Sequence, residues 1–166
     1  MGVIYRLLFL TLFTTRALAG PSLLAPGQMV DDFSWPSAVQ GQPGQRLAEQ
    51  RGYPVMLIWT DDCHRCEERL ARYQLLAQSY RHQGLVTWVI WTPQKNKQPP
   101  VIKLPVLEAD PHWKTGWQLE TTPAVMMING DGRLDHLLTG GLADNYRATE
   151  KLLSVWLSQQ PGKGER

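Results

Sequence analysis

An uninterrupted apolar run that leads directly into a helical stretch constrains the fold of this chain more than any other feature. The run is YPVMLIW, residues 53–59; it lacks the alternation of a half-exposed strand and so predicts a strand buried on both faces. Over residues 61–84, apolar side chains then recur at intervals of three and four, as on one face of a helix. Asp61 or Asp62 can cap that helix, and Gly84 can end it. A doubly buried strand followed by a helix is typical of sheets with parallel strands.

The following segments extend this pattern to residue 158. Further strands are predicted at residues 85–91, 123–128 and 133–140, further helices at 111–119 and 143–158, and a brief extended piece at 106–110. The turn signal NGDG joins the last two strands as an antiparallel hairpin, and four prolines keep residues 92–105 a loop. This order predicts an α/β fold with a central mixed sheet flanked by helices.

The N-terminus has the composition of a targeting segment. Arg6 precedes a short apolar run, and the small-x-small triplet Ala17–Leu18–Ala19 follows. We therefore predict a signal peptide over residues 1–19 and export, most simply to the bacterial periplasm. Arg16 lies between the apolar run and the cleavage site, which leaves an uncleaved membrane anchor as the alternative.

Charge and composition limit the partners and divide the chain. The formal net charge is +2, and removal of residues 1–19 with their two arginines leaves a neutral chain, so we expect no nucleic-acid partner. Residues 20–52 are rich in Gly, Pro and Gln and predict an irregular or weakly stranded lead-in with one short helical turn. The predicted domain spans 53–158, residues 159–166 form a flexible tail, and we expect a monomer.

The chain contains two cysteines, Cys63 and Cys66, at the start of the first predicted helix. Such a pair can be a redox dithiol, half of a zinc site or a small structural disulfide. Zinc is the weaker reading because there is no second cysteine pair, and we predict no metal and no other cofactor. The histidines beyond the pair are scattered: His82, His112 and His136. Two cysteines cannot form a multi-bridge scaffold, so in an exported chain chemistry is the better explanation.

Four features together resemble the thioredoxin superfamily: a buried strand leading into CHRC, a CxxC that opens a helix, the segment TTP before a hairpin, and a closing helix. The stretch PVLEADPHWKTGWQLETTPAVMMINGDGRLDHLLTGGL is similar to the later half of exported TlpA- and ResA-like thiol–disulfide oxidoreductases. The resemblance covers residues 53–158 and implies a thioredoxin-like fold.

The resemblance also implies roles for individual residues. Cys63 would be the nucleophile, because a helix N-terminus favours its thiolate, and Cys66, one turn further on, would be the resolving thiol. Pro123 would be a cis-proline beside the cysteines, and the backbone of Thr122 would pair with an extended substrate. Trp59 would lie near the cysteines and complete the substrate-binding set.

The sequence departs from the family at positions that would set the ionisation of Cys63 and Cys66. Asp62 replaces a common tryptophan, Leu57 replaces a buried acid, and Thr92 begins a loop in which an acid is usual. No familiar proton acceptor for Cys66 is present, so Glu67, Asp61 or a water are the candidates. His64 and Arg65 favour the thiolate of Cys63, whereas Asp62 opposes it. These charges predict a reduction potential between about −270 and about −120 mV.

These observations predict an exported thiol–disulfide oxidoreductase that exchanges disulfides with protein substrates through Cys63 and Cys66 and needs a redox partner protein. The direction of electron flow stays open between reductase and oxidase; residues 20–52 are too short for the dimerisation domain of an exported isomerase. The alternative is a thioredoxin-like partner-binding or assembly module in which the disulfide is structural.

Overall fold

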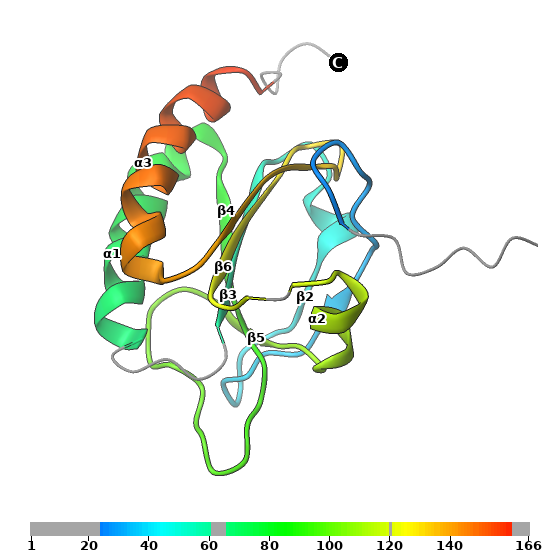
Figure 1. Ribbon diagram of the computed structural model, residues 1–166, viewed down its shortest axis with the longest axis vertical. Helices are drawn as coiled ribbons and strands as arrows, with labels where there is room; N and C mark the ends of the chain where they lie inside the picture. Colours follow the sequence, from blue (N-terminus) through cyan, green and yellow to red (C-terminus); the bar gives the residue numbers. More distant parts are fainter. Residues whose placement is uncertain (1–23, 61–65, 120, 161–166) are drawn as a thin grey trace, which may run out of the picture.

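The computed structural model describes residues 24–60, 66–119 and 121–160. Its centre is a five-stranded sheet with the strand order β5-β4-β3-β6-β7 (Figure 1). The strands are β3 (Val55–Thr60), β4 (Val86–Trp91), β5 (Val106–Glu108), β6 (Ala124–Ile128) and β7 (Leu134–Thr139). β3, β4 and β5 run parallel, whereas β6 pairs antiparallel with both β3 and β7. The predicted mixed sheet is therefore confirmed, with each strand within two residues of its expected bounds.

Helices cover both faces of the sheet. The long helices α1 (Cys66–Tyr80) and α3 (Leu142–Ser158) lie side by side on one face (Figure 1). The short helix α2 (His112–Gly116) lies on the other face with the small sheet of β1 (Ser34–Trp35) and β2 (Gln45–Arg46). Two 3-10 turns complete the elements, η1 (Leu47–Gln50) and η2 (Arg81–Gln83). None of the helices in the described segments combines the length and apolar character that crossing a bilayer requires.

Strand β3 divides the core into two halves. Every residue of β3 is buried, as the uninterrupted apolar run predicts. Because successive side chains of a strand point to opposite faces, Met56 and Ile58 pack in the cluster beneath α1 and α3. Leu57 and Trp59 pack in the cluster on the other face. Residues at the end of β3 therefore lie between two layers of buried side chains.

The second half of the core is rich in aromatic rings. Its aromatic members are Phe33, Trp35, Trp59, Trp88, Trp113 and Trp117. The Phe33 and Trp35 rings stack at 3.6 Å, and Trp35 meets Trp59 edge-on at 5.5 Å between centroids. The irregular lead-in expected over residues 20–52 thus supplies part of the core. The side chains of Trp35, Trp59 and Trp117 meet one another because three distant segments converge on the sheet.

The predicted turns form as their residues require. Gly84, with φ of +84°, follows the 3-10 turn after α1 and lies in the left-handed region that glycine adopts without strain. In the hairpin, the Asn129 side-chain oxygen accepts hydrogen bonds from the backbone N–H groups of Asp131 and Arg133, at 3.1 and 3.0 Å. Asn129 therefore stabilises the turn between β6 and β7.

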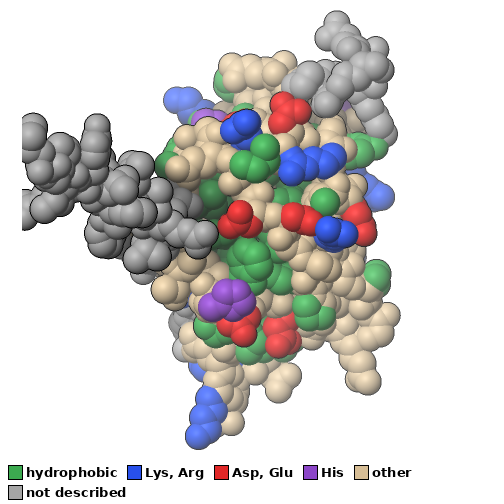
Figure 2. All heavy atoms as spheres, turned by 90° about the vertical axis from the view of Figure 1, so that its right-hand side faces the viewer, with side chains coloured by type: hydrophobic (Ala, Val, Ile, Leu, Met, Phe, Trp, Pro, Cys, Tyr) green, Lys and Arg blue, Asp and Glu red, His purple; other side chains and the backbone are tan. Residues whose placement is uncertain are grey.

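The surface over β1, β2 and α2 carries interspersed acidic and basic side chains (Figure 2). Arg46 pairs with Asp32 at 2.7 Å, and its side-chain hydrogen bond holds the pKa of Asp32 below the ordinary value. His112 binds Asp110 through its backbone N–H and its ring, and these hydrogen bonds lower the pKa of Asp110. Both pairs are exposed, so they contribute little to stability.

Candidate active site

The candidate site lies at the carboxyl end of β3. Thr60 is the last residue of β3 and Cys66 is the first residue of α1. The Thr60 Oγ1 atom is 3.1 Å from Cys66 Sγ. Cys66 is disulfide-bonded, and the chain has one other cysteine, Cys63. A disulfide sulfur carries no proton, so the Thr60 hydroxyl is the donor in this contact.

Cys66 is half-buried at the beginning of α1. It packs against the core cluster beneath α1 and α3, to which Met56, Ile58 and Leu70 belong. Cys66 therefore faces the core from the first residue of α1. Four residues of the predicted site, Asp62, Cys63, His64 and Arg65, lie outside the described residues, as does Asp61, so their predicted roles stay predictions.

Glu67 follows Cys66 in the first turn of α1 and was a candidate acceptor for its proton. The Glu67 side chain is exposed, and its carboxylate accepts a hydrogen bond from the backbone N–H of Val101 at 3.1 Å. Gln74, two turns further along α1, accepts one from Lys103 at 2.8 Å. Both side chains thus hold the proline-rich loop against the outer side of α1.

The segment expected to contact substrate lies beside the end of β3. The Thr122–Pro123 peptide bond is cis, as the family resemblance implies. The next residue, Ala124, begins β6 and pairs with Trp59 in the antiparallel register. Lys114 of α2 donates a hydrogen bond to Thr122 Oγ1 at 2.9 Å. The structure therefore brings the half-buried Thr122 and Pro123 next to the strand that leads into the cysteine segment.

Trp59 is buried and does not lie where a substrate could contact it. Its side chain is 0% exposed and meets Trp35 and Trp117 edge-on. In this conformation Trp59 offers no surface to a substrate. It packs beneath the site, so we keep only Thr122 and Pro123 as proposed substrate contacts.

The fold of this chain is similar to that of several solved structures. No family model and no curated sequence matches the chain. A solved structure from Chlorobium tepidum, provisionally named thiol:disulfide interchange protein DsbE, superimposes with a TM-score of 0.69 at 16% identity over 81% of this chain and 99% of that chain. A structure from Bacteroides thetaiotaomicron, provisionally named protein disulfide isomerase, gives a TM-score of 0.65 at 13% identity over 82% and 92%. The exposed lipoprotein thioredoxin Etrx1 of Streptococcus pneumoniae gives 0.58 at 20% identity over 73% and 98%.

The chain has a thioredoxin-like fold. This confirms the fold class predicted from the sequence, and the named interchange proteins agree with the family resemblance. At these identities the likeness establishes the fold, and the activity is argued from the site.

Two positions where relatives of this fold were expected to carry acids are neutral here. Leu57 is fully buried in the aromatic half of the core. Thr92 is buried after β4; its backbone N–H donates to the Thr60 carbonyl at 3.1 Å, and its hydroxyl has no partner among the described residues. Within the described segments, no three His, Cys, Asp or Glu side chains gather as a metal site requires.

Thr60 is the site residue that sequence reasoning missed. The signal was present: alternation along β3 places Thr60 on the same face as Met56 and Ile58, which is the face toward α1. A hydroxyl on that face at the strand end, six residues before Cys66, can reach the start of the helix.

Proposed function

We propose that this chain is an exported thiol–disulfide oxidoreductase that exchanges disulfides with protein substrates through Cys63 and Cys66. One observation carries the proposal: a disulfide-bonded, half-buried Cys66 opens α1 at the end of the central strand, and the cis Thr122–Pro123 segment borders the same strand. The named interchange proteins that share the fold support it.

The proposed reaction needs the two cysteines and no cofactor. The Cys63 thiolate attacks a substrate disulfide, whose S–S bond breaks, and one substrate sulfur leaves with the electron pair and takes a proton from water. The product is a mixed disulfide between Cys63 and the second substrate sulfur. Cys66, after losing its proton to water, attacks Cys63 Sγ and releases that sulfur. Two electrons have then passed from the dithiol to the substrate, and the reverse sequence oxidises a substrate dithiol.

In the proposed reaction, resolution, substrate binding and tuning of Cys63 fall to different residues. The packing of Cys66 against the core suits a resolving thiol, because it limits the access of a large substrate to that sulfur. The backbone of Thr122 pairs with an extended substrate segment. Lys114 of α2 holds Thr122 in place through the hydrogen bond to its hydroxyl. Asp62, His64 and Arg65 set the balance between thiol and thiolate at Cys63.

Export and a partner protein complete the proposal. The signal-like residues 1–19 motivate export, and the pneumococcal protein of the same fold is named as an exposed lipoprotein. The dithiol needs a second protein that returns it to its starting redox state after each turnover. The redox state of Cys63 and Cys66 in cells decides the direction: a reduced pair indicates a reductase and an oxidised pair an oxidase.

A trapping experiment tests the proposal. Changing Cys66→Ser leaves the Cys63 mixed disulfide without its resolving thiol, so substrate adducts should accumulate in cells and disappear under reductant. The Cys63→Ser variant is the matched control and should form few adducts. Absence of adducts, together with a purified wild-type protein that reduces no disulfide, would overturn the enzymatic proposal.

A second candidate is a partner-binding module whose disulfide is structural. The neutral Leu57 and Thr92, at positions where an acid would assist the resolving thiol, favour it. In that case the Cys63→Ser/Cys66→Ser double variant would bind its partner at wild-type affinity. Loss of binding in a double variant that still folds would support the enzyme instead.

A further inference from the structure

The hydroxyl of Thr60 lies against the sulfur of Cys66. Thr60 is 1% exposed, and its Oγ1 atom is 3.1 Å from Cys66 Sγ. The position is fixed by the sheet: Thr60 pairs with Trp91 in the parallel register, and its carbonyl accepts a hydrogen bond from the Thr92 N–H. A β-branched side chain in a strand has few rotamers, so the hydroxyl stays near the sulfur.

The strength of this contact depends on the redox state of the sulfur. In the disulfide, Thr60 donates to a neutral sulfur, which is a weak acceptor. After reduction the Cys66 sulfur can become a thiolate, and hydrogen bonds to an ionised acceptor are roughly twice as strong as neutral ones. The low dielectric around a buried donor increases this difference. The contact therefore favours the reduced pair over the disulfide.

We propose that Thr60 is a positioning residue that stabilises the Cys66 thiolate, which makes the disulfide easier to reduce and the resolving attack faster. The proposal rests on the thiol–disulfide exchange proposed above. In the resolving step the Cys66 thiol gives its proton to water, its sulfur attacks Cys63 Sγ, and the substrate sulfur leaves with the electron pair and takes a proton from solvent. Thr60 keeps its own proton throughout.

This role fits the neutral surroundings of Cys66. Leu57 and Thr92 bring no carboxylate to the sulfur, and Glu67 is exposed and bound to Val101. A general base is therefore not supplied by these three residues. A hydroxyl donor can also promote formation of the Cys66 thiolate, because its hydrogen bond lowers the free energy of the charged sulfur.

The test compares variants that differ by the hydroxyl. Thr60→Val removes it at nearly constant volume, and Thr60→Ser retains it. The pair Thr60→Ser and Thr60→Ala repeats the comparison if the valine variant does not fold. Thr87→Val is the matched control, because Thr87 is also buried, lies on the adjacent β4, and has a hydroxyl without a partner among the described residues.

Two readouts are expected to change together. In equilibrium with glutathione, Thr60→Val should favour the disulfide about tenfold over wild type, which is about 30 mV toward more negative potential for a two-electron couple. The pH profile for resolution of a preformed mixed disulfide should move to higher pH. Thr60→Ser and Thr87→Val should stay within about twofold of wild type, a change of less than about 10 mV.

The outcomes separate this inference from the proposed function. An unchanged equilibrium and pH profile in Thr60→Val, or an equal change in Thr60→Ser, would overturn the role of Thr60 while the wild type still exchanges disulfides. A wild-type protein that exchanges with neither glutathione nor a protein disulfide would overturn the proposed function itself.

Discussion

Trp59 and Ala124 pair in the antiparallel register of β3 and β6, and this pairing brings the two halves of the candidate site together. Trp59 precedes Thr60 and the cysteine segment, whereas Ala124 follows the cis Thr122–Pro123 peptide. Because β3 and β6 run in opposite directions, the end of one lies beside the beginning of the other. One strand pairing therefore positions both Thr60, which contacts Cys66, and the proposed substrate contact.

Removal of the Lys114 side-chain charge should weaken binding of protein substrates. Lys114 Nζ donates to Thr122 Oγ1 at 2.9 Å in a half-buried position. Loss of a hydrogen bond of this kind costs about 1 kcal/mol, so Lys114→Met should raise KM for a protein disulfide roughly fivefold. The equilibrium with glutathione should not change, since Lys114 acts on Thr122.

Lys151→Met is the control for that prediction, because Lys151 is exposed on α3. Steady-state kinetics with a disulfide-containing protein as substrate give KM and kcat separately. A fall in kcat at constant KM would contradict a role of Lys114 in substrate positioning.

The sequence predicts the elements of this fold well because each has a local signal. The continuous apolar run gives β3, the three-and-four spacing gives α1, and the NGDG turn gives the β6–β7 hairpin. The predicted caps of α1, Asp61 or Asp62, lie outside the described residues. The parallel order of β3, β4 and β5 follows from how these elements must connect.

Long-range contacts were not predictable in the same way. Phe33 and Trp35 lie in a segment without periodicity, yet they pack in the core because three distant segments meet there. The contact of Lys114 with Thr122 depends on where α2 lies on the sheet. The alternation along β3 indicates the face on which Thr60 lies, but its 3.1 Å distance from Cys66 Sγ depends on how α1 packs on the sheet.

The charge at Arg65 should set part of the reduction potential. We expect the wild-type potential between about −270 and about −120 mV. Arg65→Gln should shift it by roughly 5–20 mV toward more negative values, because a solvated charge interaction of about 0.2–1 kcal/mol with the Cys63 thiolate is lost. Equilibration with glutathione measures both values.

Arg72→Gln provides the matched control for the Arg65 variant. It removes one arginine charge as well, from the middle of α1, where the Arg72 guanidinium lies 4.3 Å from the Tyr146 ring centroid. Its potential should equal that of the wild type. A wild-type potential below about −270 mV would show that Asp62 outweighs Arg65 and His64.

Tyr73 should make stability fall at high pH. Burial raises the pKa of the Tyr73 hydroxyl to about 12, and the hydroxyl donates to the Leu142 carbonyl at 3.0 Å. The unfolded value is about 10, so the folded state favours the neutral phenol. That stabilisation is complete below about pH 10 and is lost as pH rises through about 12.

The expected loss is on the order of 2–3 kcal/mol of the free energy of unfolding. Tyr73→Phe should start from a lower stability near neutral pH, since the hydrogen bond to Leu142 is absent, and should then fall less steeply above pH 10. Urea unfolding at a series of pH values measures both curves. Parallel curves for the two proteins would show that Tyr73 does not ionise with unfolding.

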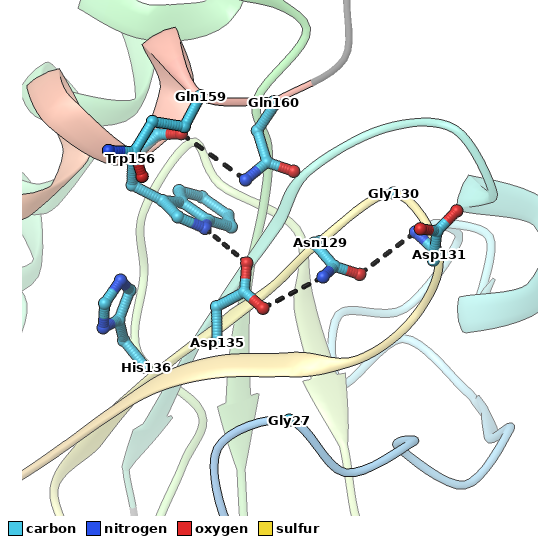
Figure 3. A pocket seen from close by; sticks show the side chains of 9 residues that line it. All are labelled: Gly27, Asn129, Gly130, Asp131, Asp135, His136, Trp156, Gln159 and Gln160. Carbon is cyan, nitrogen blue, oxygen red and sulfur yellow. Dashed lines mark hydrogen bonds between the residues drawn. The ribbon is translucent and has the colours of Figure 1, made fainter.

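The hydrogen bonds of Asp135 should stabilise α3 on the hairpin without affecting the redox site. Asp135 of β7 accepts a hydrogen bond from Trp156 Nε1 at 2.7 Å and another from Asn129 Nδ2 at 2.9 Å (Figure 3). Asn129 follows β6, whose last residue pairs with the first residue of β3, so this cluster lies at the opposite end of the sheet from Thr60. Trp156→Phe removes the indole N–H, so Asp135 Oδ2 loses that hydrogen bond.

A hydrogen bond to a charged group contributes about 1.5–3 kcal/mol, so Trp156→Phe should lower the free energy of unfolding by about 2 kcal/mol. The control is Val155→Ala, because Val155 is exposed on the same helix and its truncation should change stability by less than about 0.5 kcal/mol. Both variants should keep the wild-type equilibrium with glutathione. A Trp156→Phe protein as stable as the control would show that Asp135 finds water in place of the indole, whereas an altered redox equilibrium would show that the two ends of the sheet are coupled.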